Sequence, residues 1–421
     1  MTQLYSPALP ALRMGEPLAV YVHWPWCKAK CPYCDFNSHA GQPHEEAYVD
    51  ALLNDFTELR EASLISASEN DSTAVLGRPL VSLFFGGGTP SLMHWKSIAR
   101  VIEAVADLGT AQADFEVTVE CNPTSFESPA DAKRFFDELS VAGVNRVSIG
   151  IQGLNDEALG FLGREHNVAD ALRTLDAAQA VFKRVNADVI YGLPGQTPVE
   201  WETLLRTLAG RELAHLSAYQ LTIEPQTAFY SQVKRGAWTP VDSDTEAHFF
   251  ETTHSLLQAC GYENYEISNF CRPGEACRHN LHIWNGGDYA GVGAGAHGRL
   301  TLRDGTRLAT RVVRQPEAYL CAPRPPLGSI YHTAKLDATE SVQEAIFASL
   351  RLATGVDSDR LKKRFSDSAY EAAVDEPAVA FLMAKGLLNT RPQGFALSTA
   401  GWPLLDLVLQ QILRPLPVPQ A

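Results

Sequence analysis

Apolar and polar positions alternate in two different periods along the first half of the chain. Short apolar runs of strand-like composition, each followed within a few residues by Gly, Pro or Asn, predict β-strands. They lie at Leu18–His23, Val81–Phe85, Phe115–Glu120, Arg146–Ile151, Val185–Tyr191 and His215–Leu221. The longer amphipathic stretches between them predict helices at Glu45–Arg60, His94–Leu108, Ala130–Ala142, Asp156–Leu162 and Val168–Phe182.

Regular alternation of strands and helices predicts an α/β fold with a parallel sheet and right-handed crossovers. Six such units would form an incomplete (β/α)6 barrel of the TIM type, since a full barrel has eight. A doubly wound open sheet is the alternative that the same alternation allows. In either fold the carboxyl ends of the strands form the edge where active sites lie.

The second half of the chain divides into two further regions. We expect an N-terminal segment at 1–17, the partial barrel at 18–240, a barrel extension at 241–325 and a C-terminal helical domain at 326–421. The extension is less regular, and the proline cluster Pro323–Pro326 predicts a linker. Helices are expected at Glu340–Ala353, Ser358–Phe365, Pro377–Lys385 and Gly401–Ile412, with a turn and strand at Leu387–Leu397. This order is typical of a winged helix, but its few, balanced positive charges favour packing or a protein partner over DNA.

Three cysteines follow the first predicted strand. Cys27, Cys31 and Cys34 have the spacing C-x3-C-x2-C, and the next cysteine is Cys121. Three thiolates on one loop can hold three irons of a 4Fe–4S cluster and leave the fourth iron open for chemistry. A structural zinc site would need a second C-x2-C or a Cys/His pair at finger spacing, and none follows. We therefore predict an open iron–sulfur cluster.

Other chemically capable residues follow the next strands in turn. The glycine-rich run Gly86–Pro90 comes after the second strand. Glu120, Gln152 and Asp188 lie near the ends of the third, fourth and fifth. Because these ends share one edge of the sheet, we expect all of these groups to meet there.

Composition narrows the classes of partner. The 421 residues carry a net charge of −14, which disfavours nucleic acid as a partner. No apolar run is long enough to span a bilayer, and the first residues do not have the pattern of a secretory signal. Eight scattered cysteines do not suggest a disulfide scaffold. We expect a soluble, cytoplasmic protein.

With these motifs in place, the first three hundred or so residues resemble the radical S-adenosylmethionine (SAM) superfamily. Within it they are most similar to the oxygen-independent coproporphyrinogen III oxidases and their relatives, and most of all to the heme chaperones called HemW. The resemblance extends over nearly the whole chain, including the C-terminal domain. Its motifs are Cys27/Cys31/Cys34, Gly86–Pro90, Glu120–Pro123, Gly150–Gln152, Gly163–His166 and Asp188–Thr197.

The resemblance implies a 4Fe–4S cluster and SAM as cofactors. The implied SAM-binding residues are Tyr21, Gly87, Gly88, Thr89, Glu120, Gln152, Arg164 and Asp188. Arg164 suits the methionine carboxylate, because a guanidinium binds a carboxylate through two parallel hydrogen bonds. In the superfamily the reduced cluster passes an electron to SAM, which yields methionine and a 5′-deoxyadenosyl radical.

Two departures distinguish the chain from the oxidases. They carry another cysteine two positions after the third cluster ligand, where this chain has Phe36, and they have a long N-terminal arm. Here the first strand begins at Leu18. Both departures favour the heme chaperone branch, without coproporphyrinogen oxidase activity. The alternative is an oxygen-independent coproporphyrinogen III dehydrogenase that forms protoporphyrinogen IX, and a third is a radical enzyme with an unrelated substrate.

The heme chaperones carry an H-N-x-x-Y-W element associated with heme. Here it reads His279–Trp284, with Ile283 at the tyrosine position and an additional His282. His279 is a candidate axial ligand of heme iron, His282 a possible substitute and Cys277 a nearby thiol. A buried cluster of aromatic and histidine side chains would explain the element equally well.

The resemblance implies heme and apo-hemoproteins as partners, respiratory enzymes among them. A homodimer and peripheral membrane association are compatible with it. One motif is set aside: Gly293–Gly298 fits G-x-G-x-x-G but does not open a helix in a βαβ unit, so we expect a tight loop rather than a dinucleotide site. His297, in this loop, is expected near the substrate side.

Overall fold

The computed structural model describes residues 15–64, 78–123, 128–322 and 331–415. Most of the predicted N-terminal segment and the proline cluster Pro323–Pro326 lie outside these ranges. The described residues form two main hydrophobic cores, one in the barrel and one in the C-terminal domain. In the described part of the chain, no helix is both long and apolar enough to cross a membrane.

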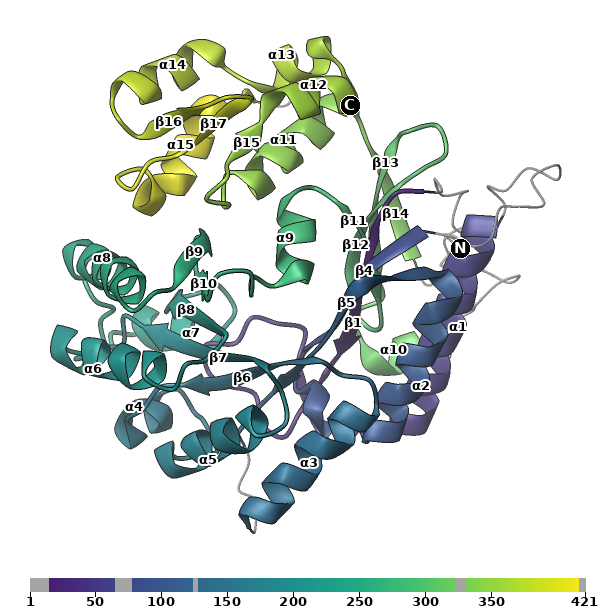
Figure 1. Cartoon of the computed structure of the whole chain (residues 1–421), viewed down its shortest axis with the longest axis vertical. Helices are drawn as coiled ribbons and strands as arrows, with labels where there is room; N and C mark the ends of the chain where they lie inside the picture. Colours follow the sequence, from purple (N-terminus) through teal and green to yellow (C-terminus); the bar gives the residue numbers. More distant parts are fainter. Residues whose placement is uncertain (1–14, 65–77, 124–127, 323–330, 416–421) are drawn as a thin grey trace.

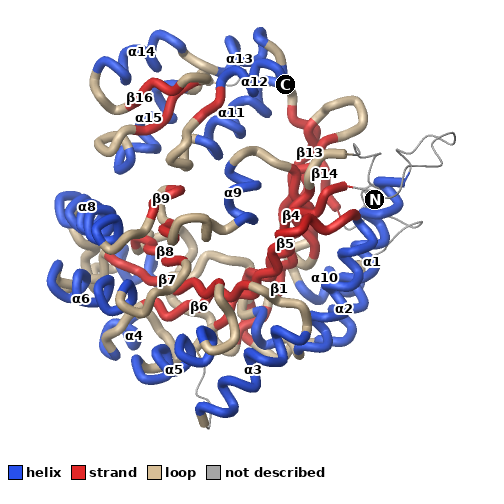
Figure 2. Tube along the Cα trace, in the orientation of Figure 1, coloured by secondary structure: helices blue, strands red, loops and turns tan. Residues whose placement is uncertain are grey.

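A single curved sheet of twelve strands organises the larger part of the molecule (Figures 1 and 2). Its centre consists of the six predicted strands, which pair in parallel and in chain order. They are β1 (Leu18–Trp24), β4 (Arg78–Gly87), β5 (Gly109–Cys121), β6 (Arg146–Gln152), β7 (Arg184–Tyr191) and β8 (His215–Gln220). The incomplete (β/α)6 barrel is therefore confirmed.

Helices cover the convex face of the sheet (Figure 1). They are α1 (Glu45–Leu64), α2 (Trp95–Val105), α3 (Pro129–Val141), α4 (Asp156–Phe161), α5 (Val168–Gln179), α6 (Pro198–Ala209) and α8 (Ser243–Ala259). The short α7 (Ala228–Lys234) contacts the cysteine loop, since the amide of Phe229 donates to the Pro32 carbonyl at 2.9 Å. Several of these helices are capped at their N-termini by their own polar side chains. Asn167 and Asp170 form a capping box on α5, and Thr197 and Glu200 form another on α6. Since the crossover helices lie on one face, the doubly wound alternative does not apply.

The barrel extension is more regular than its sequence pattern suggested. Strand β11 (Asp288–Val292) pairs in parallel with β1, and β12 (His297–Thr301) and β13 (Arg307–Val312) follow antiparallel. Strand β14 (Tyr331–Leu336), from the region expected to be the C-terminal domain, pairs antiparallel with β13 and forms the edge of the same sheet. At the other edge, β10 (Asn269–Cys271) and β9 (Glu263–Glu266) continue from β8. The loop Gly293–Gly298 leads from β11 towards β12 and opens no helix, as predicted. Helix α10 (Pro316–Cys321) follows β13 and packs against α1.

The C-terminal domain combines helices with a three-stranded antiparallel sheet of order β15–β17–β16. In chain order it contains α11 (Ala338–Ser349), β15 (Val356–Asp357), α12 (Ser358–Phe365), α13 (Asp367–Ala373), α14 (Glu376–Ala384), β16 (Leu388–Arg391), β17 (Gly394–Leu397) and α15 (Leu405–Ile412). This is the element order expected of a winged helix. Helix α9 (Arg278–Trp284) lies between this domain and the concave face of the sheet (Figure 1).

Candidate functional site

The three predicted cluster cysteines line one cavity of about 520 Å³ at the carboxyl ends of the strands, here called the outer cavity. Short strands β2 (Trp26–Cys27) and β3 (His39–Ala40) pair and close the loop that carries the cysteines. Within the loop, the amide of Cys34 donates to the carbonyl of Cys31 at 3.1 Å. All three thiols therefore approach the same space from one short segment.

The three thiols are close enough to influence the pKa of Cys27. Burial raises the pKa of Cys27, and the neighbouring thiols of Cys34 and Cys31 raise it further, while Thr89 opposes them. A bound metal would reverse this balance, because it stabilises thiolates directly. The donor set suits a cluster of several irons.

Hydrogen bonds connect the first cluster thiol to the second across the cavity wall. Thr89 Oγ1 donates to Cys27 Sγ at 3.4 Å and accepts from Asn122 Nδ2 at 2.9 Å. Asn122 Oδ1 accepts from Arg164 Nη2 at 2.6 Å, and Arg164 Nη1 donates to Cys31 Sγ at 3.5 Å. Arg164 lines the outer cavity, and its Nη2 also donates to the Gly150 carbonyl at 2.9 Å. Asn122 was not among the predicted site residues, although its motif was.

The glycine-rich loop after β4 lies directly against the first strand. At Gly87, whose φ is +110°, a Cβ atom would come within 2.5 Å of the His23 ring. At Gly88 it would come within 2.6 Å of the Trp26 carbonyl oxygen. The amide of Gly87 donates to Glu120 Oε2 at 3.2 Å. Only glycine allows the backbone to approach this closely.

Two carboxyl groups face the boundary of the outer cavity. Burial raises the pKa of Glu120 to about 8, and the charge of Asp188 contributes. Burial also raises the pKa of Asp188, against hydrogen bonds that include Ser148 Oγ at 2.9 Å. Gln152, at the irregular end of β6, has a φ of +60°, which is uncommon for a residue with a Cβ atom.

The structure divides the predicted residues between two cavities. The outer cavity contains the three cysteines together with Gly87, Gly88, Thr89, Glu120, Gln152, Arg164 and Asp188. Tyr21 and His279 instead line a second cavity of about 450 Å³, here called the inner cavity, where Tyr21 also bonds His23 Nδ1 at 3.0 Å. The two cavities share Glu120, Ser148, Asp188 and Tyr219, so they adjoin along one wall.

Polar side chains that sequence reasoning missed line the inner cavity. Asn186 Nδ2 donates to Ser148 Oγ at 2.6 Å and to Ser217 Oγ at 3.0 Å, across three adjacent strands. Arg146 lies on the same strand as Ser148 and is also buried. A signal was present, because Arg146 and Ser148 on β6, and Asn186 and Asp188 on β7, alternate with apolar residues.

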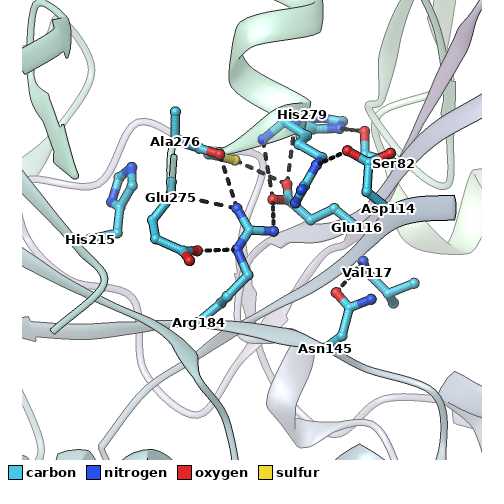
Figure 3. A network of polar contacts seen from close by, with 12 residues as sticks. Ser82, Asp114, Glu116, Val117, Asn145, Arg184, His215, Glu275, Ala276 and His279 are labelled. Atoms are coloured by element: carbon cyan, nitrogen blue, oxygen red, sulfur yellow. Dashed lines mark hydrogen bonds and ion pairs between the residues drawn. The ribbon is translucent and has the colours of Figure 1, made fainter. Parts of the chain in front are cut away.

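Figure 3 shows how the candidate heme element is fixed to the barrel. The buried carboxylate of Glu116 accepts from Arg184 Nη1 at 2.7 Å and from Cys277 Sγ at 3.3 Å. It also accepts from the amides of Arg278 at 3.1 Å and His279 at 3.2 Å, the first two residues of α9. A strand carboxylate thus holds the start of this helix, where negative charge is favourable.

His279 is the imidazole of the element that lines the inner cavity. Its Nδ1 lies 2.9 Å from Ser82 Oγ, its ring stacks on Phe84 at 4.9 Å, and burial lowers its pKa to about 3. His282 Nε2 donates to the Asp288 carbonyl at 2.8 Å, and His282 is not among the residues described as lining either cavity. Burial raises the pKa of the Cys277 thiol to about 12. His297, which was expected near the substrate side, also lines the inner cavity.

The C-terminal domain holds the other end of α9. The guanidinium of Arg351 lies over the Trp284 ring at 4.7 Å. Arg360 donates to the carbonyl of Asn285 at 2.9 Å, and Arg364 donates to the carbonyl of Gly286 at 2.8 Å. Cations therefore gather just beyond the carboxyl end of the helix, which complements its dipole.

Comparison with known proteins agrees with this arrangement. The radical SAM superfamily profile matches residues 21–208, and the HemN C-terminal domain profile matches residues 336–404. The heme chaperone HemW of Escherichia coli (strain K12) is 41% identical over 309 residues, 72% of this chain and 76% of that protein. The mitochondrial radical S-adenosyl methionine domain-containing protein 1 of Mus musculus is 36% identical over 401 residues, 94% of this chain and 87% of that protein.

Among solved structures, coproporphyrinogen III oxidase (HemN) from Escherichia coli, a radical SAM enzyme, shares the fold. Its TM-score is 0.75 at 22% identity, and the match covers 94% of this chain and 89% of that chain. The outer cavity with its three thiols, the helix held against the inner cavity and these matches lead to one conclusion. The chain belongs to the radical SAM superfamily and, within it, to the HemW-like branch of the oxygen-independent coproporphyrinogen III oxidase family.

Proposed function

We propose that this protein is a heme chaperone that binds a 4Fe–4S cluster, SAM and heme, and transfers heme to apo-hemoproteins. The observation that carries the proposal is the position of His279, on the wall of a cavity that adjoins the cofactor cavity. The names of the HemW relatives support it.

Membership of the superfamily implies the cluster and SAM, and the outer cavity offers suitable groups for both. Cys27, Cys31 and Cys34 would hold the cluster, which supplies an electron to SAM when both are bound. The guanidinium of Arg164, which lines the outer cavity, would receive the methionine carboxylate. Gly87, Gly88 and Thr89 would face the methionine part of SAM. Glu120, Gln152 and Asp188 would bond the amino group or the ribose hydroxyls of SAM.

The inner cavity offers suitable groups for heme. Its volume lies in the range of ligand sites, and the aromatic rings of Phe84 and Trp284 provide apolar wall. When His279 donates its Nδ1–H to Ser82 Oγ, the lone pair of Nε2 is available to iron. Its low pKa keeps the imidazole neutral at pH 7, as ligation requires.

The second candidate function is oxidation of coproporphyrinogen III. The shared wall of the two cavities favours it, since a porphyrinogen in the inner cavity would face the cofactor cavity. Phe36 counts against it. Its side chain, at 59% exposure, lines the outer cavity where the oxidases carry a cysteine.

One experiment separates the two functions. Anaerobically reconstituted protein with SAM and a reductant receives coproporphyrinogen III in one vessel and heme in another. Saturable heme binding without protoporphyrinogen IX supports the chaperone, whereas turnover of coproporphyrinogen III overturns it. The variant His279→Ala should lose heme affinity, with His282→Ala as the matched control because His282 is bonded to Asp288. Delivery is tested by mixing heme-loaded protein with an apo-hemoprotein and following its absorption spectrum.

A further inference from the structure

Arg146 occupies an unusual position in the inner cavity. It lies on β6 and is only 3% exposed, yet it lines the cavity. Among the residues that the structure describes, no hydrogen bond or ion pair within 4.0 Å holds its guanidinium. None of the Arg146 guanidinium nitrogens is both fully enclosed and unpaired, whereas Arg78 and Arg307 each have one such nitrogen. The Arg146 guanidinium is therefore open to the cavity.

The carboxylate next to Arg146 is already occupied. Glu116 and Asp188 balance the charge of Arg146 through space. The two oxygens of Glu116, however, accept four hydrogen bonds, from Arg184, the Cys277 thiol and the first two amides of α9. A carboxylate has about four lone-pair sites, so Glu116 has no capacity left for Arg146.

Several other polar groups near Arg146 are also committed, although the hydroxyl of Thr118, opposite Arg146 on β5, is not. Ser148 Oγ donates to Asp188, and Asn186 bonds Ser148, Ser217 and His215. A buried guanidinium without hydrogen bonds is costly, and a ligand that supplied them would remove that cost. Its planar fork matches a carboxylate, which it can bind through two parallel hydrogen bonds.

The sheet register places Arg146 close to the candidate iron ligand. Ser82 of β4, which is bonded to His279, stands opposite Glu116 of the adjacent strand β5. Arg146 of β6, the strand after β5, stands opposite Thr118 of β5. His279, which is bonded by Ser82 of β4, and Arg146 of β6 thus line the same cavity. A cargo that carried both a metal and carboxylate side chains would meet both groups.

We infer that Arg146 is a binding residue for a carboxylate side chain of the molecule in the inner cavity, which for heme is one of its two propionates. The inference rests on the proposed function for the identity of the cargo. It assigns a role to a charge that neither the cluster nor SAM uses.

The test compares heme with heme dimethyl ester, whose propionates carry no charge. Both are titrated anaerobically into the full-length, cluster-loaded protein, and binding is followed by absorption. The wild-type protein should bind heme more tightly than the diester by about tenfold. Arg146→Gln should remove that preference by weakening heme alone, whereas Arg146→Lys should retain part of it.

Arg184→Gln is the matched control. Arg184 is also buried near Glu116, but it is held by Glu116, Glu275 and the Ala276 carbonyl, and it is not among the residues lining the inner cavity. Its loss should weaken heme and the diester equally, because it acts through α9. Iron content and far-UV circular dichroism identify any variant that fails to fold, and the wild-type comparison does not depend on a variant.

Three results would overturn the inference. Equal affinities of the wild-type protein for heme and the diester would remove Arg146 as a carboxylate partner while leaving the chaperone proposal intact. An equal loss of both ligands in Arg146→Gln would make the residue structural. Failure of the wild-type protein to bind either ligand would overturn the chaperone proposal and, with it, this inference.

Discussion

Glu116 Oε1 accepts a hydrogen bond from the main-chain amide of His279 at 3.2 Å, so a buried strand residue fixes the helix that carries the candidate heme ligand. The same carboxylate pairs with Arg184 at 2.7 Å. Strands β5 and β7 and the candidate heme element on α9 are therefore connected by one polar network, although they are far apart in the sequence.

Glu116→Gln should destabilise the protein by about 3 kcal/mol, because it removes the buried partner of Arg184 and leaves only the more exposed Glu275 to compensate that charge. Urea unfolding at pH 7 measures this cost. Glu275→Gln is the control, since Glu275 pairs with the same Arg184 from a side chain that is 40% exposed. It should cost less than about 1 kcal/mol. Equal costs for the two variants would show that Glu116 does not have this role.

The same residue predicts an acid dependence. Burial alone would raise the pKa of Glu116, but Arg146, Arg184 and the two helix amides lower it to about 2, from 4.5 when unfolded. Its contribution to stability is therefore complete above pH 4.5 and is lost as the pH falls from about 4.5 towards 2. Glu116→Gln should lack this part of the acid transition.

Replacing Cys27, Cys31 or Cys34 by Ala should remove the iron and the visible absorption of the reconstituted protein, because each thiolate is a proposed cluster ligand. Cys121→Ala is a close control. Cys121 also lines the outer cavity, but its thiol is buried and bonds the Val119 carbonyl. Unchanged iron content in the first three variants would contradict the assignment.

The sequence was most informative where chain order determines spatial order. Parallel strands in chain order bring their ends to one edge, so the positions of Gly87, Glu120 and Asp188 along the chain were enough to place them in one cavity. Arg164, from a loop after α4, was placed by the family motif alone. Tyr21 also came from that motif, and its side chain lines the inner cavity instead.

The inner cavity could not be derived in the same way. One wall of this cavity is formed by α9, which precedes β11 in the chain. Strand β11 pairs with β1, about 270 residues away in the sequence, and no local sequence pattern encodes that pairing. The environment of His279 depends in turn on Glu116, whose role is visible only when both elements are in place. The alternating polar residues such as Asn186 and Ser217 were visible, but hydrophobic periodicity alone gave them no function.

Ser82→Ala should reduce heme affinity about tenfold and shift the heme absorption spectrum, because Ser82 orients the proposed ligand His279. Thr118→Val removes a hydroxyl from the neighbouring strand and is the matched control. The Thr118 hydroxyl is buried without a partner, so its loss should not alter heme binding. The same affinity in Ser82→Ala as in the wild-type protein would argue against ligation by His279.

Arg364→Met should reduce heme affinity about fivefold without changing iron content, because Arg364 holds the carbonyl of Gly286 beyond the end of α9. Lys363→Met, an exposed neighbour on α12, is the control for the loss of one positive charge. Heme titration of both variants measures the effect. Equal affinities would mean that the C-terminal domain does not position the heme element through this contact.

His254 connects the barrel to the C-terminal domain, since its ring packs against Phe270 at 5.0 Å and against Trp402 at 5.5 Å. Burial lowers its pKa to about 4, and its Nε2 is buried without a partner. The folded state therefore resists protonation of this ring, and stability is lost as the pH falls from about 6.5 towards 4. His254→Phe should remove about 1–2 kcal/mol of the difference in unfolding free energy between pH 7 and pH 5. His248→Phe, at an exposed position of α8, controls for the exchange itself, and an unchanged pH dependence in His254→Phe would show that this ring is not the sensitive group.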